Sequence, residues 1–169
     1  MKTDIVFRKI RSDSVKDLDE LSELAHKIWN DHYPDIIGQK QVDYMLNKFY
    51  SGESLSEQIN IKNNIFTGAY INDELAGFLS HSVTGESEYF IHKLYVNTEM
   101  QRKGIGRDLF VNVFGKLKQK TIRLTVNRQN FEAVNFYFRL GFTIEKTTDI
   151  DIGNGFLMND FIMIFRSDK

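Results

Sequence analysis

A strand, a glycine-bearing turn and an amphipathic helix follow one another in the middle of the chain, and this run constrains the fold most. Residues 89–96 have a strand pattern, and a helical pattern covers 104–119. The apolar residues of one helix face are Ile105, Leu109, Phe110, Val113, Phe114 and Leu117. Gly104 and Gly106 let the backbone approach a ligand closely. The first N–H groups of the helix lack intrahelical partners at its positive end, so the turn suits a pyrophosphate.

This turn fits one of three phosphate-binding patterns. The P-loop pattern G-x-x-x-x-G-K-[ST] does not occur in the chain. The dinucleotide pattern G-x-G-x-x-G fails because Leu109 stands where the third glycine belongs. The remaining pattern is Q-x-x-G-x-G, which begins at Gln101. Three basic residues accompany it, namely Arg102, Lys103 and Arg107.

The segment before residue 60 is expected to be mainly helical. Ser14 opens a capping-box pattern ahead of an apolar helix face. Pro34 disfavours helical backbone in the residue before it, which predicts a helix end near Tyr33. Two more helices are expected, one over 39–50 and a short one capped by Ser54 that runs toward Ile59.

The rest of the chain has mainly strand patterns. The expected strands cover 5–10, 65–71, 74–83, 89–96, 121–126, 142–148 and 156–165. Asn72-Asp73 predicts a tight hairpin turn, 151–155 a second turn, and Gly141 the end of a helix over 130–140. The β–α–β unit over 89–126 requires one parallel pair of strands. We therefore expect an α+β fold with a mixed sheet and helices on both of its sides.

Composition narrows the class of protein. The 22 basic and 23 acidic residues balance, which gives no support for nucleic-acid binding. No apolar run approaches the roughly 20 residues of a membrane helix, and the first residues lack the apolar core of a signal peptide. The absence of cysteine excludes disulfides, thiolate metal sites and a cysteine acyl-enzyme. We expect a cytoplasmic protein with no membrane or nucleic-acid partner.

A second motif lies one predicted helix and one predicted strand after the glycine turn. Residues 130–142 read N-F-E-A-V-N-F-Y-F-R-L-G-F. The turn and this segment together resemble the two signatures of the GNAT (GCN5-related N-acetyltransferase) family, and the resemblance covers nearly the whole chain. It implies a GNAT-like fold with a central, twisted, mixed but mostly antiparallel sheet of about seven strands and helices on both faces. Residues 1–169 are then expected to form a single acetyltransferase domain.

The resemblance also implies acetyl-CoA as cosubstrate and no metal. Backbone groups near Leu94, Tyr95 and Val96 would hold the pantetheine arm, and one N–H there would face the thioester oxygen. The turn 101–107 would hold the pyrophosphate, and Asn130 would bind the pantetheine or orient the loop. The implied cofactor-binding residues are Leu94, Tyr95, Val96, Gln101, Arg102, Lys103, Gly104, Ile105, Gly106, Arg107, Asn127, Asn130 and Tyr137.

Acetyl transfer to an amine needs a neutral amine, a donor for the oxyanion and a proton for the leaving thiolate. The resemblance places Tyr137 near the sulfur of CoA, where it would supply that proton. His92 stands where many family members carry a glutamate, and a neutral imidazole is a suitable base near pH 7. A structural role is the alternative for His92, with Glu88 and His81 as other candidate bases. Direct attack in a ternary complex is expected because the chain has no cysteine for a covalent route.

The acceptor is expected near the end of the first helix, where aromatic and acidic residues suit a cationic amine. The predicted contacts are Trp29, His32 and Tyr33, although Trp29 also fits a core position. The Trp-x-x-x-Tyr segment, residues 44–46 and residues 160–163 are similar to bacterial spermidine/spermine-type acetyltransferases. That similarity favours a small primary amine such as a polyamine.

Other functions remain open on the sequence. One alternative is acetylation of peptide or protein N-termini. The chain also fits a CoA-binding regulator without activity, or a protein-interaction module that uses the aromatic helices over 26–50. A homodimer is a further expectation.

Overall fold

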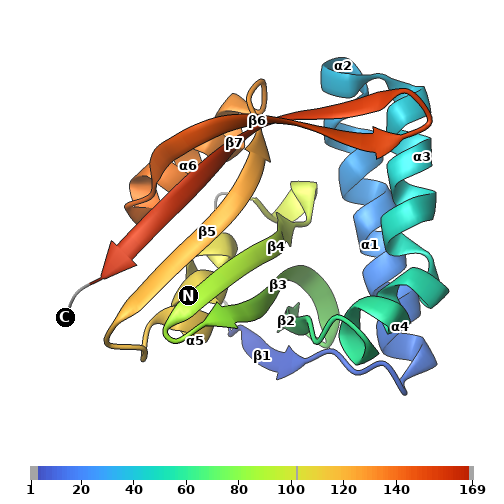
Figure 1. The fold of residues 1–169 in the computed structure, drawn as a ribbon. Helices are drawn as coiled ribbons and strands as arrows, with labels where there is room; N and C mark the ends of the chain where they lie inside the picture. Colours follow the sequence, from blue (N-terminus) through green and yellow to red (C-terminus); the bar gives the residue numbers. More distant parts are fainter. Residues whose placement is uncertain (1–3, 102, 168–169) are drawn as a thin grey trace. The chain divides into compact units, whose positions relative to one another are not determined.

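The computed structural model describes residues 4–101 and 103–167, which form six α-helices and seven strands. In chain order the elements are β1 (Val6–Lys9), α1 (Val15–His32), α2 (Pro34–Ile37), α3 (Gln39–Tyr50), α4 (Gly52–Asn60), β2 (Ile65–Ile71), β3 (Glu74–Gly85), β4 (Glu88–Val96), the 3₁₀ turn η1 (Thr98–Met100), α5 (Ile105–Phe114), β5 (Lys120–Asn127), α6 (Phe131–Leu140), β6 (Thr143–Gly153) and β7 (Phe156–Ser167) (Figure 1).

The strands are hydrogen-bonded in the order β1-β2-β3-β4-β5-β7-β6. The pair β4 and β5 is parallel, from Glu88↔Thr121 to Ile91↔Leu124. The pairs β1–β2, β2–β3, β5–β7 and β6–β7 are antiparallel. The expected mixed and mostly antiparallel sheet is therefore confirmed, and its parallel pair is the one that the β–α–β unit requires.

The described residues group into two compact units. The first comprises the chain up to His81 together with Lys93–Lys116, and the second comprises Ser82–His92 together with the chain from Leu117 onward. Strand β4 passes from the second unit into the first between His92 and Lys93. The expectation of a single domain over 1–169 stays a prediction.

In the first unit, α1 and α3 lie side by side (Figure 1). The Ser14 hydroxyl accepts a hydrogen bond of 3.2 Å from the Asp17 N–H and so caps α1 as expected. Strands β2 and β3 are joined by Asn72 and Asp73, whose φ angles of 51° and 63° are those of a tight hairpin turn. The core that these elements enclose includes Leu21, Ala25, Val42, Leu55, Phe66 and Phe78, all with no exposed surface.

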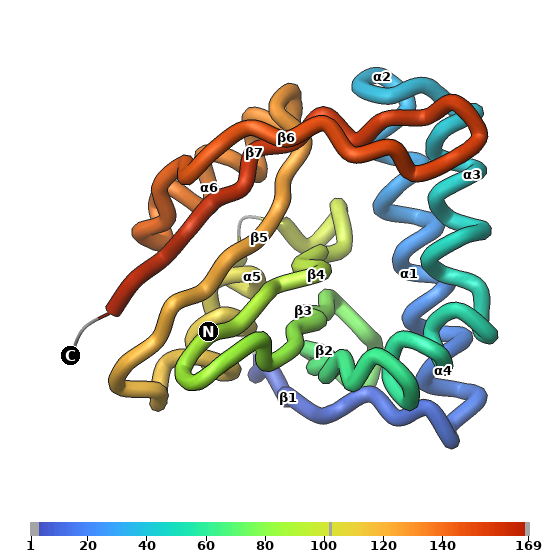
Figure 2. The backbone as a smooth tube through the Cα atoms, viewed as in Figure 1, coloured from blue at the N-terminus to red at the C-terminus, as the bar shows by residue number. Residues whose placement is uncertain are grey.

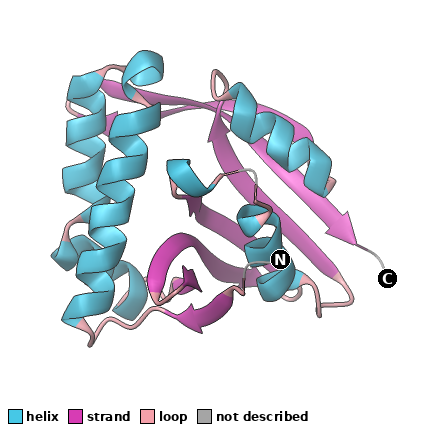
Figure 3. Cartoon of the chain, turned by 180° about the vertical axis from the view of Figure 1, so that it is seen from behind, coloured by secondary structure: helices cyan, strands magenta, loops and turns pink. Residues whose placement is uncertain are grey.

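In the second unit, α6 covers one face of the strands (Figure 3). On β5 the buried residues Ile122, Leu124 and Val126 alternate with half-buried polar ones, so the strand has an apolar and a polar face. Phe165 pairs with Ile122 in register and therefore lies on the apolar face. Phe142 links this ring to α6, with ring centroids 5.5 Å from Phe165 and 5.5 Å from Tyr137. Helix α6 therefore packs on the apolar face of β5, and the polar face lies on the other side.

Two expected helix bounds are wrong. Ser51, not Ser54, caps the fourth helix, because the Ser51 hydroxyl accepts a hydrogen bond of 3.2 Å from the Ser54 N–H. Helix α5 ends at Phe114 rather than near residue 119, since Gly115 follows and glycine is a poor helix former. The short helix α2, which the sequence did not predict, begins at Pro34, because proline is favourable at the first position of a helix.

The last hairpin has a shorter turn and a longer first strand than expected. Residues 151–153 belong to β6, and the turn consists of Asn154 and Gly155, with φ angles of 55° and 78°. The long hairpin of β6 and β7 can be followed in Figure 2. Asn-Gly is the preferred pair for this turn because both residues tolerate positive φ. A register shift between Asp151 and Gly153 accommodates the glycine that made this segment resemble a loop.

Candidate active site

The glycine turn follows β4 through a short, well-fixed connection. The Asn97 N–H donates to the carbonyl of Ala76 over 2.8 Å, and its side-chain oxygen accepts from the Glu99 N–H over 3.1 Å. The Gln101 amide donates over 3.4 Å to the carbonyl of Val96. These contacts tie the start of the turn to the end of β4. Arg102, one of the predicted phosphate ligands, lies outside the described residues.

The start of α5 is available to an anion. Gly104 is the N-cap with a left-handed φ of 81°, and no side chain caps the helix. A Cβ at Gly104 would meet nothing within 4 Å, so the space beside it is open. Lys103 and Arg107 are exposed on either side. The first N–H groups of α5 and the helix dipole therefore lie where the sequence predicts a pyrophosphate, with two exposed cationic residues within three positions of Gly104, and these residues fit that group.

The end of β4, which is predicted to contact the pantetheine arm, packs closely against its neighbours in the first unit. Leu94, Tyr95 and Val96 are half-buried at the end of β4. A Cβ built on Gly77 would lie 2.7 Å from the Tyr95 carbonyl oxygen, so only glycine fits on β3 at this place. The Tyr95 ring packs at 5.8 Å from Phe78 and 6.0 Å from Trp29.

The residues predicted in the second signature lie in the second unit. The side-chain oxygen of Asn130, which is buried, accepts a hydrogen bond of 3.2 Å from the Ala133 N–H and caps α6. The side-chain oxygen of Asn127, the last residue of β5, accepts from the Gln129 N–H over 2.9 Å. Tyr137 is buried on α6 against Phe136 and Phe142. The conformation of the β5–α6 connection is thus fixed by two asparagines.

The three candidate bases have different environments. His92 is exposed, and its Nε2 shares a hydrogen bond of 2.8 Å with the Ser82 hydroxyl, while its ring lies 4.9 Å from Phe90. His81 is buried against Phe114, and burial lowers the pKa of its imidazole, which keeps it neutral at pH 7. Glu88 is exposed at the first position of β4. His92 is exposed, and its ring is oriented by the hydrogen bond to the Ser82 hydroxyl.

The predicted acceptor residues meet in an aromatic cluster of the first unit. Trp29 stacks on Tyr33 with a centroid distance of 4.4 Å, and His32 meets the same tyrosine edge-on at 5.1 Å. Tyr50 and Tyr95 complete the cluster at 5.9 and 6.0 Å from Trp29. Trp29 is only 5% exposed, a burial that is compatible with the core position that the sequence also allows.

Sequence reasoning missed a half-buried lysine in the same unit. The Lys93 ammonium donates to the Gln58 side-chain oxygen over 2.7 Å and lies over the rings of Tyr50 and Phe66, 5.2 and 5.8 Å from their centroids. Burial, with a smaller effect of the Lys62 charge, lowers the pKa of Lys93 to about 8. Its only sequence signal is a cationic residue within an otherwise apolar strand. These contacts connect β4 with α3, α4 and β2.

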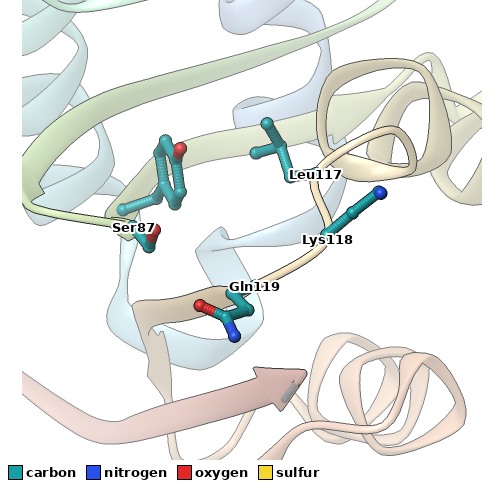
Figure 4. Close-up of a pocket in the computed structure, with 5 residues that line it drawn as sticks. Ser87, Leu117, Lys118 and Gln119 are labelled. Carbon is teal, nitrogen blue, oxygen red and sulfur yellow. The ribbon is translucent and has the colours of Figure 1, made fainter. Parts of the chain in front are cut away.

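The second unit has a surface hollow that none of the predicted site residues lines. It measures about 490 Å³ and is lined by Ser87, Tyr89, Leu117, Lys118 and Gln119 (Figure 4). These residues flank the first residues of β4 and β5 within the second unit. Within the ranges 4–101 and 103–167, no group of acidic residues and histidines is arranged to hold a metal. No helix in the same ranges is long and apolar enough to cross a membrane.

Comparison with known proteins assigns the family. Residues 34–163 match the model of the acetyltransferase (GNAT) domain. The spermidine N(1)-acetyltransferase of Thermoplasma acidophilum is 31% identical over 150 residues, which cover 85% of this chain and 92% of that protein.

Solved structures agree with this assignment. The PaiA N-acetyltransferase of Thermoplasma acidophilum, in complex with coenzyme A, aligns with a TM-score of 0.79 and 28% identity over 96% of this chain and 99% of that one. Ard1 from Thermoplasma volcanium shares the fold, with a TM-score of 0.73 and 18% identity over 98% and 99% of the two chains. The chain belongs to the GNAT family of acetyltransferases, whose members use acetyl-CoA.

Gly104→Val is expected to weaken CoA binding at least about tenfold, since one lost charge-assisted hydrogen bond is worth roughly 1.5–3 kcal/mol. The matched control is Gly38→Val, because Gly38 is also a helix N-cap with positive φ and open space around its Cβ. Valine is the more strained at Gly38, whose ψ of 151° belongs to a region that is essentially restricted to glycine, whereas the ψ of 2° at Gly104 is that of a left-handed helix. Calorimetric titration with CoA measures the affinities. Equal affinity in both variants would show that the turn does not hold the pyrophosphate.

Proposed function

We propose that this GNAT enzyme transfers the acetyl group of acetyl-CoA to a primary amine of a small cationic acceptor, with a polyamine such as spermidine as the first candidate. The observation that carries the acceptor class is the 31% identity, over 85% of the chain, to a spermidine N(1)-acetyltransferase. The exposed, uncapped start of α5 supports the cofactor half of the proposal, since it offers N–H groups and cations to a pyrophosphate. A cytoplasmic location and a homodimer stay predictions.

In this proposal the acceptor nitrogen attacks the thioester carbon directly. The nitrogen gives up a proton, and the leaving thiolate takes one. Tyr137 is assigned the role of giving a proton to the leaving thiolate. A phenol whose ordinary pKa is about 10 remains protonated at pH 7 and has a proton to give. Tyr137 is buried on α6 and its ring packs against that of Phe142, which supports a fixed position for the hydroxyl.

His92 is assigned the role of accepting the proton that the amine nitrogen gives up. The hydrogen bond to Ser82 orients the imidazole, and its exposure leaves the ring accessible to an amine or to a bridging water. A neutral imidazole accepts a proton, whereas an imidazolium does not. The backbone near Leu94–Val96 is assigned two roles. It would hold the pantetheine arm, and one of its N–H groups would donate to the oxyanion that forms from the thioester oxygen.

Thiol release from acetyl-CoA in the presence of spermidine tests the function. The wild-type protein is expected to release CoA in proportion to the amine consumed. Tyr137→Phe is expected to bind CoA normally and to lose roughly 10²–10⁴-fold in kcat, the usual contribution of general acid catalysis. Phe136→Leu, on the neighbouring position of α6, is the control for packing. No release by the wild type with polyamines, amino acids, aminoglycosides or peptide N-termini would refute the function, and an unchanged kcat in Tyr137→Phe would make that residue structural.

His92→Gln tests the base. In the wild type, the profile of kcat against pH at saturating amine should have an acidic limb, in which kcat falls below about pH 6.5, the ordinary pKa of a histidine. The variant should have a lower kcat without this limb and an unchanged affinity for CoA. Ser82→Ala keeps the imidazole but removes its hydrogen bond, so it should retain the limb. An identical limb in His92→Gln would exclude His92 and favour Glu88.

A further inference from the structure

A network of polar contacts joins the last two turns of α1 to the 3₁₀ turn η1. The Thr98 hydroxyl donates to the Asp31 carboxylate over 2.7 Å. The Lys27 ammonium bridges the two elements, because it lies 3.3 Å from the Asp31 carboxylate and 3.2 Å from that of Glu99. The paired residues are 67 and 72 positions apart in the chain, and all four belong to the first unit. The network is therefore a tertiary contact between α1 and η1.

The backbone of η1 is attached to β3 through Asn97, a buried residue at the end of β4. The Asn97 N–H donates to the Ala76 carbonyl of β3 over 2.8 Å. Its side-chain oxygen accepts from the Glu99 N–H over 3.1 Å, and its carbonyl accepts from the Met100 N–H over 2.8 Å. The backbone of η1 is thus tied to the sheet, whereas its side chains are tied to α1.

The position of η1 affects the predicted pyrophosphate turn because the two are adjacent in the chain. Residue 101, the first of the turn, follows η1 directly, and the N-cap of α5, Gly104, comes three residues later. A displacement of η1 therefore carries into the first N–H groups of α5. A ligand binds more tightly to groups that are already held in place, since less ordering is lost on binding. Contacts that fix η1 are thus expected to favour CoA binding.

The network is suited to local positioning more than to global stability. The side chains of Lys27, Asp31 and Glu99 are 39, 44 and 74% exposed, and ion pairs at such exposure add little to the free energy of unfolding. The Thr98 hydroxyl, followed by the Lys27 charge, lowers the pKa of Asp31, so its carboxylate is ionised at neutral pH. A short hydrogen bond to a carboxylate is directional and fixes the orientation of η1.

We propose that Asp31 is a positioning residue for CoA binding, which holds η1, and with it the pyrophosphate turn, against the end of α1. The proposal rests on the assignment of the pyrophosphate to the turn 101–107. The same end of α1 carries Trp29, His32 and Tyr33, which are the predicted acceptor contacts. The network therefore joins the segments assigned to the two substrates, and Asp31 needs no contact with either substrate for this role.

Asp31→Ala separates positioning from direct electrostatics, because the two predict changes of opposite sign. Removing an anion would by itself strengthen the binding of the anionic CoA. Loss of positioning weakens it, and we expect the Kd of CoA to rise about fivefold, within the range for residues that change affinity without touching the ligand. Calorimetric titration of each protein with CoA measures the Kd. An unchanged or lower Kd in Asp31→Ala would overturn the proposal.

The matched control is Asp19→Ala, which removes an exposed carboxylate from the same helix. The change of charge and of residue type is identical, but Asp19 lies three turns away from the contacts with η1. Asp19→Ala should keep the wild-type Kd. A rise of the same size in both variants would overturn the proposal, because the effect would then not depend on the network.

Substitutions on η1 test the other end of the contact. Thr98→Val removes the hydroxyl and should raise the Kd, whereas Thr98→Ser keeps a hydroxyl and should restore the wild-type Kd. The double variant Asp31→Ala/Thr98→Val should bind CoA no more weakly than Asp31→Ala, because both changes break the same hydrogen bond. Additive losses in the double variant would overturn the proposal.

Melting temperature and amide exchange separate positioning from partial unfolding. The melting temperature of Asp31→Ala should stay close to that of the wild type, because alanine is the best helix former and the lost contacts are exposed. Exchange of the Glu99 and Met100 N–H groups should be faster, since the hold of α1 on η1 is lost. A large fall in melting temperature, or unchanged exchange at these groups, would overturn the proposal and make Asp31 a structural residue.

Failure of the premise gives a different result. If the turn does not hold CoA, Gly104→Val binds CoA as tightly as Gly38→Val, and Asp31 has no cofactor turn to position. Weaker binding by Gly104→Val together with wild-type affinity in Asp31→Ala would overturn only the role of Asp31. All of these titrations use CoA without an acceptor, so an absence of turnover with spermidine leaves their outcome unchanged.

Discussion

The unsatisfied N–H groups at the start of α5 are the physical constraint on which the proposed cofactor site depends. A helix start must find acceptors in a side chain, in water or in a ligand. At α1, α4 and α6 a serine or asparagine side chain provides one, but at α5 the N-cap is Gly104, which has no side chain. Because the neighbouring Lys103 and Arg107 are cationic, an anionic ligand completes this end better than water does.

The two faces of the second unit's strands differ in chemistry. The apolar face of β5 carries α6 and the buried Tyr137, and this packing gives the tyrosine a fixed place. The polar face carries Asn127 and Asp160 in register. Strand alternation keeps these two sets of residues on opposite sides.

Sequence reasoning predicted what local patterns determine. The bounds of β2 and α3, the Ser14 cap and the parallel pair were all confirmed, because periodicity, capping and the β–α–β connection are local. The sequence could not decide whether Ser51 or Ser54 caps α4, since serine suits a helix N-cap at either position and only the backbone geometry selects one. The burial of Lys93 and Asp160 depends on residues distant in sequence, such as Gln58 for Lys93 and Thr125 for Asp160, and no local pattern marks it.

Amide hydrogen exchange with and without CoA tests the central claim most directly, because it reports on the N–H groups themselves. CoA should slow exchange at the first residues of α5, over 104–108, and leave the first residues of α3, over 39–42, unchanged. Both segments begin at a glycine without a side-chain cap, so the start of α3 is the control for the start of α5. CoA binding that leaves 104–108 unprotected would contradict the account, since the pyrophosphate would then lie elsewhere.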